Sequence, residues 1–359
     1  MRTHEAGALH ADVSEPPSSV LVPPRDAAAL APAVWAASVT RGDGGALGVG
    51  GMDVRDLAAA YGTPAYVLDE ADFRARCRAF RQAFGEGGAD GGPAVHYAAK
   101  AFCCLAVLRW VVEEGLGLDV CTGGELVAAL RAGVPADRIA LHGNNKSVAE
   151  LERALDAGVG RVVVDSFVEI ARLAWLAEQR GLRQPVLVRA TVGVEAHTHE
   201  FIATAHEDQK FGFSLGSGDA FEAARRVVGH PSLELAGVHS HIGSQIFDTS
   251  GFEVSAHRAV GLLVRVRDEL GAGPPYLDLG GGFGVAYTEA DDPMDVPALA
   301  AAMRSIVARE AGAAGLAMPR PGSIARAGTP MPYDVHSRST MLRSDLPIST
   351  TSTGSSALV

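Results

Sequence analysis

A single lysine closes an apolar segment early in the chain. Lys100 follows His96-Tyr97-Ala98-Ala99, and it is the only lysine among the first 140 residues of a chain that otherwise uses arginine. At the end of a buried strand its ammonium would be partly desolvated, which favours the neutral amine needed to form a Schiff base. An isolated lysine is more often an ordinary surface residue, but this position and this rarity favour a chemical role.

Two later segments have the residue types that hold a phosphate and an aromatic ring. Gly280-Gly281-Gly282 directly follows Leu277-Asp278-Leu279, and a glycine turn after a strand lets backbone N–H groups approach an anion. One strand earlier, in His239–Gln245, Ser244 can donate to the same phosphate and an imidazole can stack on an aromatic cofactor. Alternatively, the glycine triplet is only a turn, and the histidines are a pair of satisfied core residues.

Composition narrows the class of protein. With 359 residues, 47% of them hydrophobic, the chain can bury a large core. A net charge of −11 without any basic run argues against a nucleic acid or an anionic membrane as partner, and no apolar run reaches membrane-spanning length. The four cysteines have no metal-ligand spacing and fit reduced thiols. We therefore expect a cytoplasmic protein with a small-molecule ligand and no metal.

The candidate residues belong to a regular alternation of strands and helices that begins at Pro93. Parallel strands joined by helical crossovers produce this pattern. The predicted strands are Ala94–Ala99, Gly117–Cys121, Ile139–Gly143, Arg161–Asp165, Pro185–Ala190, Leu235–His241 and Tyr276–Leu279. The predicted helices are Leu105–Glu114, Gly124–Ala132, Val148–Ala157, Phe167–Gln179, Ala220–Val228 and Val254–Leu270.

Periodicity alone does not separate a barrel from an open doubly wound sheet. The polar residues do, because in a barrel the carboxyl ends of the strands form one ring around one site, whereas an open sheet gathers its ligands at a switch point. Polar residues and glycines follow nearly all seven strands, and they are Lys100, Thr122, Asn144, Ser166, Thr191, His241, Ser244 and Gly280–Gly282. The sequence therefore predicts an α/β fold with a βα barrel.

The order of the motifs resembles that of diaminopimelate decarboxylases, in particular the actinobacterial members. These are group IV decarboxylases that depend on pyridoxal 5'-phosphate, so the resemblance implies a (β/α)8-type barrel like that of alanine racemase. It extends from about Gly51 to Ala317, and its motifs are highly specific. They are Tyr97–Phe102, Gly117–Leu126, His142–Ser147, Gly193–Glu200, Asp208–Phe213, His239–Gln245 and Leu279–Phe283.

The resemblance implies a role for each matching position. Lys100 would attach the cofactor covalently, His241 would lie against its pyridine ring, and Ser244 with Gly281 and Gly282 would hold its phosphate. The implied reaction converts meso-2,6-diaminopimelate to L-lysine and carbon dioxide, and the implied assembly is a homodimer.

Two further motif residues have simpler alternatives. Asp119 can serve only to fix the barrel ring, and Glu125 can serve only to start a helix. The segments Ala196–Glu200 and Asp208–Phe213 resemble a long loop that borders the substrate entrance in the family. We assign no individual catalytic residue to that loop.

Three segments are expected: an irregular N-terminal arm (1–50), a cofactor-binding barrel (51–317) and an aberrant, disordered tail (318–359). After Ala317 the family pattern calls for an apolar strand ending in Glu-Pro-Gly-Arg, but Met318-Pro319-Arg320-Pro321-Gly322 follows instead. Proline and glycine make a poor central strand, so strand eight and the C-terminal β domain with its proton donor are expected to be missing. A reading-frame shift near residue 320 would explain the change, and little turnover by this chain is expected.

Two other functions remain open. A noncatalytic barrel that binds pyridoxal phosphate would not need the sheet domain, although such a barrel lacks the Ala196–Glu200 motif. Another group IV amino-acid decarboxylase, acting on ornithine or arginine, would share the lysine and the glycine turn. It matches Gly117–Leu126 and Ala196–Glu200 less well.

Overall fold

The computed structural model describes residues 26, 28–85, 95–193, 211–289, 291–321 and 357–358. The loop expected to border the substrate entrance falls largely outside these ranges, as does most of the expected tail. No described helix combines the length and the apolar character that crossing a membrane requires.

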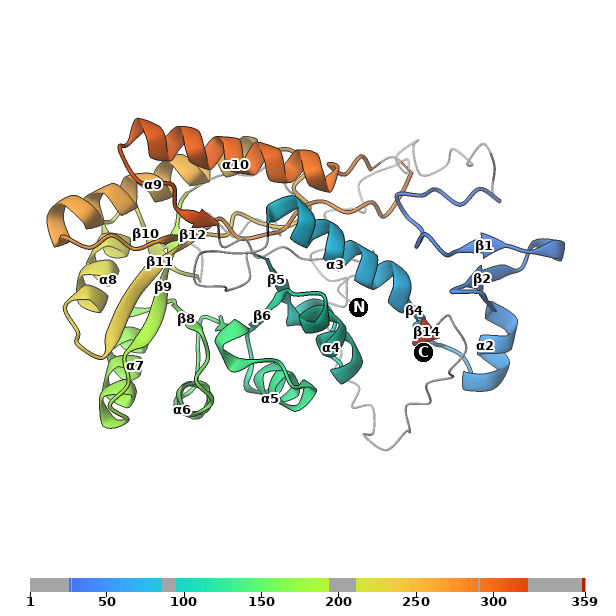
Figure 1. Cartoon of the computed structure of the whole chain (residues 1–359), viewed down its shortest axis with the longest axis horizontal. Coiled ribbons are helices and arrows are strands. Elements are labelled where there is room, and N and C mark those ends of the chain that lie inside the picture. Colours follow the sequence, from blue (N-terminus) through green and yellow to red (C-terminus); the bar gives the residue numbers. More distant parts are fainter. Residues whose placement is uncertain are drawn as a thin grey trace, which may run out of the picture.

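A sheet of parallel strands curls around a common interior and carries helices on its outside (Figure 1). The strand order is β13-β12-β11-β9-β8-β7-β6-β5, so neighbours in the sheet are neighbours along the chain, as consecutive βα units require. All seven predicted strands are confirmed: β5 (His96–Ala98), β6 (Gly117–Val120), β7 (Ile139–Leu141), β8 (Arg161–Val164), β9 (Gln184–Thr191), β11 (Leu233–His239) and β12 (Tyr276–Asp278). The short β10 (Phe213–Ser214) pairs with β9.

The position after β12 holds a strand that the sequence did not predict. β13 (Arg320–Pro321) runs parallel to β12, with Arg320 opposite Tyr276 and Pro321 opposite Leu277. Proline has no N–H to donate, but a strand at a sheet edge needs partners on one side only. The eighth position is thus occupied by two residues rather than left empty. Among the described residues no pairing joins β13 to β5, so the sheet is open between these edges.

Helices pack on the outward face of the strands because side chains alternate between two faces along a strand. In β6, Leu118 and Val120 belong to the large core shared with the helices. A second, small apolar cluster contains Val163, Leu187 and Ala236. All six predicted helices are confirmed, and the described helices are α2 (Val54–Tyr61), α3 (Glu70–Phe84), α4 (Leu105–Glu113), α5 (Gly123–Ala132), α6 (Val148–Ala157), α7 (Phe167–Gln179), α8 (Asp219–Val228), α9 (Ser250–Leu270) and α10 (Val296–Ala313).

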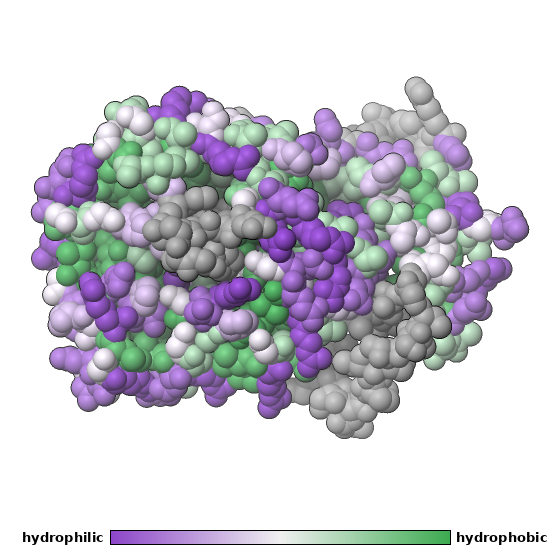
Figure 2. Space-filling view, viewed as in Figure 1, coloured by the Kyte–Doolittle hydropathy of each residue, from purple (hydrophilic) through white to green (hydrophobic). Residues whose placement is uncertain are grey.

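Helix α3 connects the edge strand β5 to the loop after β12 through aromatic packing. Phe73 meets Tyr97 of β5 edge-on, with ring centroids 5.7 Å apart. Phe80 and Phe84 each stack on Phe283, which follows the glycine turn after β12, with ring centroids 6.3 Å apart. The outer face of α3 is hydrophilic (Figure 2), as expected of a helix with one buried side.

A small antiparallel sheet precedes the curled sheet. It contains β1 (Thr40–Arg41), β2 (Leu47–Val49) and β3 (Met52–Asp53), so the expected arm over residues 1–50 is regular in part. The short strand β4 (Leu68–Asp69) directly precedes α3. β4 pairs antiparallel with β14 (Ala357–Leu358) and lies outside the parallel sheet.

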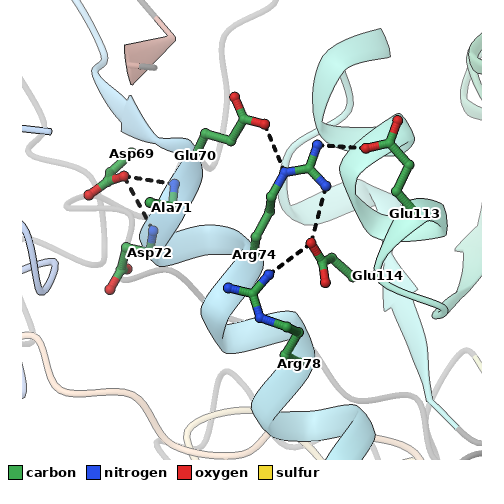
Figure 3. Close-up of polar contacts among 8 residues, drawn as sticks. All are labelled: Asp69, Glu70, Ala71, Asp72, Arg74, Arg78, Glu113 and Glu114. Carbon is green, nitrogen blue, oxygen red and sulfur yellow. Dashed lines mark hydrogen bonds and ion pairs between the residues drawn. The ribbon is translucent and has the colours of Figure 1, made fainter. Parts of the chain in front are cut away.

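An arginine on α3 links this helix to the end of α4 (Figure 3). The Nε of Arg74 donates to Glu70 at 2.7 Å, and its Nη atoms donate to Glu113 at 2.6 Å and to Glu114 at 3.1 Å. Arg78 donates to the same Glu114 at 2.9 Å. Because the side chains of Arg74 and Glu114 are only 21% and 14% exposed, this network is screened less than an isolated surface pair.

Replacing Arg74 with methionine should destabilise the protein measurably. The change keeps the apolar stem and removes three charge-assisted bonds, so we expect the free energy of unfolding to fall by about 1–2 kcal/mol. Urea unfolding measures this value. As a control, Arg225→Met breaks an exposed pair with Glu222 and should leave the urea midpoint unchanged. Equal effects of the two substitutions would contradict a stabilising network.

Candidate active site

Lys100 lies on a short 3-10 turn, Ala99–Ala101, directly after β5. The residue is exposed, whereas Ala99 before it is fully buried. The expected partial desolvation of its ammonium is therefore not found. The strand ends before the lysine, and the turn carries the side chain out of the packed interior.

The loops after β11 and β12 touch backbone to backbone. Gly280 and Gly282 have φ values of +74° and +93°, a region that side chains rarely adopt. A Cβ on Gly282 would lie 1.9 Å from the carbonyl oxygen of Gly243, and one on Gly280 would lie 2.5 Å from that of Ser240. The N–H of Ser240 also donates to the carbonyl oxygen of Asp278 at 2.8 Å. Only glycine fits at both positions of the turn.

This close approach gathers the predicted phosphate ligands. A Cβ on Gly282 would lie 3.2 Å from the Cα of Ser244, and one on Gly280 would lie 3.0 Å from Nδ1 of His241. The N–H of Gly280 donates to the Asp278 carboxylate at 2.8 Å. Within the described part of the chain, the N–H groups of the buried Gly281 and Gly282 have no hydrogen-bond acceptor. Lys100 follows β5, at the same end of the parallel sheet.

Beneath these loops the interior carries a layer of ionisable side chains. In the strand register, His239 of β11 lies beside Arg189 of β9 and Asp278 of β12. Nε of Arg189 is 3.7 Å from Oδ1 of Asp165, which follows β8. The small apolar cluster lies one layer nearer the amino ends, because Leu187 precedes Arg189 by two residues on the same side of β9.

Burial dominates the electrostatics of this layer. Burial raises the pKa of Asp119 to about 7, although the charge of Lys100 opposes this shift. Burial also lowers the pKa of His142 and of His239 well below the usual histidine value, and the charge of Arg189 acts in the same direction. At neutral pH both imidazoles are neutral, and Asp119 is near the midpoint of its titration.

Lys146, which belongs to one of the predicted motifs, links neighbouring elements of the fold through hydrogen bonds. Its buried Nζ donates to the carbonyl oxygens of Gly143 at 2.7 Å and Val163 at 2.6 Å, and to the carboxylate of Glu169 at 2.7 Å. These bonds join the ends of β7 and β8 to α7.

Several residues of the predicted polar ring begin helices. Thr122 and Ser166 are the N-caps of α5 and α7, and their hydroxyls accept from backbone N–H groups three residues later. The carboxylate of Glu125 accepts from the N–H of Cys121 at 2.7 Å, just before α5 begins. This contact fits the alternative that Glu125 serves to start the helix. In the described ranges, no group of three or more metal-ligating side chains could hold a metal ion.

Sequence reasoning missed Arg189. It lies inside the apolar run predicted as the fifth strand, where a charged residue is unusual. Arg189 lies two positions from both Leu187 and Thr191, and this spacing could have indicated that its side chain points inward. Its partner Asp165 is identified only by the structure.

A family model described as pyridoxal-dependent decarboxylase, pyridoxal binding domain, matches residues 70–320. The match begins at α3 and ends at the first residue of β13, so it covers the curled sheet and the candidate site. The fold and the site therefore define a pyridoxal-binding barrel of the pyridoxal-dependent decarboxylases.

Individual proteins similar to this chain share a more specific name. The diaminopimelate decarboxylase of Mycobacterium leprae (strain TN) is 51% identical over 346 residues, covering 93% of this chain and 72% of that protein. The enzyme of the same name from Mycobacterium tuberculosis (strain ATCC 25618 / H37Rv) is 55% identical over 315 residues, covering 85% of this chain and 69% of that protein. The chain belongs to the diaminopimelate decarboxylase family.

A solved structure agrees with this assignment. The diaminopimelate decarboxylase of M. jannaschii, crystallised with L-lysine, is 29% identical and superimposes with a TM-score of 0.73. The alignment covers 81% of this chain and 66% of that structure.

Alanine at Gly282 should disrupt the loop contact. The added Cβ cannot avoid the Gly243 carbonyl, so we expect at least about tenfold weaker binding of pyridoxal phosphate and a lower urea midpoint. Absorbance titration and urea unfolding measure the two effects. The matched control is Gly261→Ala within α9, where a Cβ meets nothing within 4 Å and should stabilise the helix by about 0.5–1 kcal/mol. Unchanged cofactor affinity in the Gly282 variant would refute this role of the turn.

Asparagine at Asp119 should change how stability depends on pH. Because the folded-state pKa of about 7 exceeds the ordinary value of 3.8, the native protein holds this proton more tightly than the unfolded chain. The contribution of Asp119 to stability is therefore lost as pH rises from 3.8 to about 7. We expect the Tm of Asp119→Asn relative to the parent to be higher at pH 8 than at pH 5 in differential scanning fluorimetry. A difference that does not change with pH would contradict the raised pKa.

Proposed function

We propose that this chain binds pyridoxal 5'-phosphate through Lys100 and acts in the decarboxylation of meso-2,6-diaminopimelate to L-lysine and carbon dioxide. The observation that carries the proposal is the buried glycine turn, which leaves the N–H groups of Gly281 and Gly282 without described acceptors. A dianionic phosphate is the group that such a turn accommodates.

The other residues present fit the same cofactor. Ser244 has a hydroxyl donor beside the turn, and His241 has a flat ring beside Gly280. The carboxylate of Asp278 holds the N–H of Gly280 and thus fixes the turn before any ligand arrives. Lys100 is exposed at the same end of the sheet, where a carbonyl compound can reach its amine.

The cofactor, when bound, would supply an electron sink for the bond that breaks as carbon dioxide leaves. The chain's own contribution is to hold and orient. Ser244 and the glycine turn would anchor the phosphate, His241 would limit the tilt of the ring, and Lys100 would provide the exchangeable amine. The interior layer that contains Arg189 and Asp165, 3.7 Å apart, lies below these loops.

The choice of substrate rests on the relatives. Their name specifies diaminopimelate, and one solved relative was crystallised with L-lysine, the product of that reaction. Ornithine and arginine decarboxylation is the second candidate, because the family model covers pyridoxal-dependent decarboxylases in general. The homodimer implied by the resemblance remains a prediction that light scattering can test.

Borohydride reduction in the presence of pyridoxal phosphate should attach a pyridoxyl group to Lys100. Peptide mapping by mass spectrometry identifies the modified lysine, and the Lys100→Ala variant is the control. Pyridoxyl on other lysines alone would overturn the cofactor assignment.

Carbon dioxide release from isotopically labelled meso-diaminopimelate should depend on Lys100. We expect the Lys100→Ala variant to release no carbon dioxide. The parent chain should release more carbon dioxide from meso-diaminopimelate than from ornithine or arginine, because the longer diamino diacid is its proposed substrate. The low turnover expected from the sequence is measured in the same assay. Release that favours ornithine would support the second candidate.

A further inference from the structure

Two buried polar atoms face each other where β6 and β7 end. Oδ1 of Asp119 and Nε2 of His142 are 3.3 Å apart, and the two residues are 8% and 7% exposed. Neither atom has a hydrogen-bond partner among the residues that the structure describes. The strand register explains their meeting, because Asp119 pairs with Ala140 and His142 lies two residues further on the same side. Such a pair is costly unless the two groups serve each other.

The surroundings of His142 fix its ring and keep it neutral. His239 of β11 meets the ring edge-on, with centroids 4.8 Å apart and planes at 81°. The charged groups around it are Arg189 of β9, Lys146 after β7 and Lys100 after β5. Burial lowers the pKa of His142 well below its usual value, and His239 and these cations act in the same direction. A neutral imidazole with its proton on Nε2 can donate to a carboxylate.

Asp119 connects this histidine to the candidate lysine. It pairs in register with Ala98, two residues before Lys100. Burial raises the pKa of its carboxyl and Glu125 adds to that effect, whereas Lys100, Arg189 and Lys146 oppose it. A donor on the carboxyl favours the ionised form. A hydrogen bond from Nε2 of His142, which lies 3.3 Å from Oδ1 of Asp119, would therefore favour the ionised carboxylate, and the charge of Lys100 favours the same form.

We propose that His142 is a positioning residue, which orients the Asp119 carboxylate toward Lys100 and thereby sets how readily the lysine amine gains and loses a proton. The inference rests on the proposed function, because it concerns the lysine assigned to the cofactor. His142 itself acts only through Asp119. The simpler alternative is that His142 and Asp119 only fill the interior.

The lysine content of the chain allows a direct test without cofactor or substrate. The sequence has three lysines, Lys100, Lys146 and Lys210. An amine-acetylating reagent, followed by mass spectrometry, reports the labelling rate of each one as a function of pH. Lys146 is 4% exposed and reports opening of the fold, and a lysine-containing reference peptide added to each reaction normalises the reagent.

The variants separate a hydrogen-bonding role from a space-filling role. His142→Leu removes the donor, whereas His142→Gln places an amide N–H where Nε2 stood. We expect Lys100 labelling at pH 7.5 to rise about threefold to tenfold in His142→Leu and in Asp119→Asn, because the ammonium loses a charged partner. His142→Gln should label like the parent, and His142→Leu should add nothing in the Asp119→Asn background. If His142→Leu opens the fold, as fast Lys146 labelling would reveal, His142→Asn replaces it, since its shorter amide does not reach Asp119.

Three results would overturn the proposal. These are unchanged Lys100 labelling in the donor-free variants, equal labelling in the leucine and glutamine variants, or a full effect of His142→Leu in the Asp119→Asn background. Borohydride trapping on the parent chain is independent of these readouts. If trapping misses Lys100 while the labelling results hold, the proposed function fails and the positioning role of His142 stands.

Discussion

The backbone contact between the loops after β11 and β12 is the constraint on which the candidate site depends. Gly282 meets the Gly243 carbonyl so closely that no side chain fits between them, and its φ of +93° suits glycine alone. Because the two main chains touch, a serine hydroxyl, an imidazole and two buried N–H groups gather without any long side chain reaching across. The turn is thus held in shape by packing rather than by a ligand, a form of preorganisation that lowers the cost of binding an anion.

Much of the fold could be predicted because the strands and helices alternate strictly and several helices, among them α5, α6 and α7, begin at a capping side chain. Lys100 and the glycine turn could be identified because both follow apolar runs. The small N-terminal sheet precedes this alternation, and β13 (Arg320–Pro321) has no apolar run, so neither could be predicted. The predicted ring of polar residues around the site included too many members. Thr122, for example, follows a strand as a ligand would, but it serves as the N-cap of α5. The positions of the interior charged residues could be identified only from the strand register, which places Arg189 beside His239.

The interior of the sheet combines paired ionisable groups with a carboxyl whose buried Oδ1 has no hydrogen-bond partner among the described residues. Lys146 lies 2.7 Å from Glu169 and Arg189 lies 3.7 Å from Asp165, and the bonds of Lys146 to two carbonyl oxygens offset its desolvation. Between these pairs, burial keeps His142 neutral. The remaining carboxyl of Asp119 then responds to small changes in its neighbours, which is the electrostatic arrangement typical of functional sites.

The aromatic packing of Phe283 has a consequence for the order in which the protein folds. Phe80 belongs to the helix that leads into the strand before Lys100, while Phe283 directly follows the glycine turn, so their contact joins opposite ends of the barrel sequence. Contacts between such distant segments form late, after the intervening strands have been assembled side by side. We therefore expect the contact between Phe80 and Phe283 to form after those strands have paired. A chain that has folded only some of its strands has the residues of the candidate site but not yet its geometry.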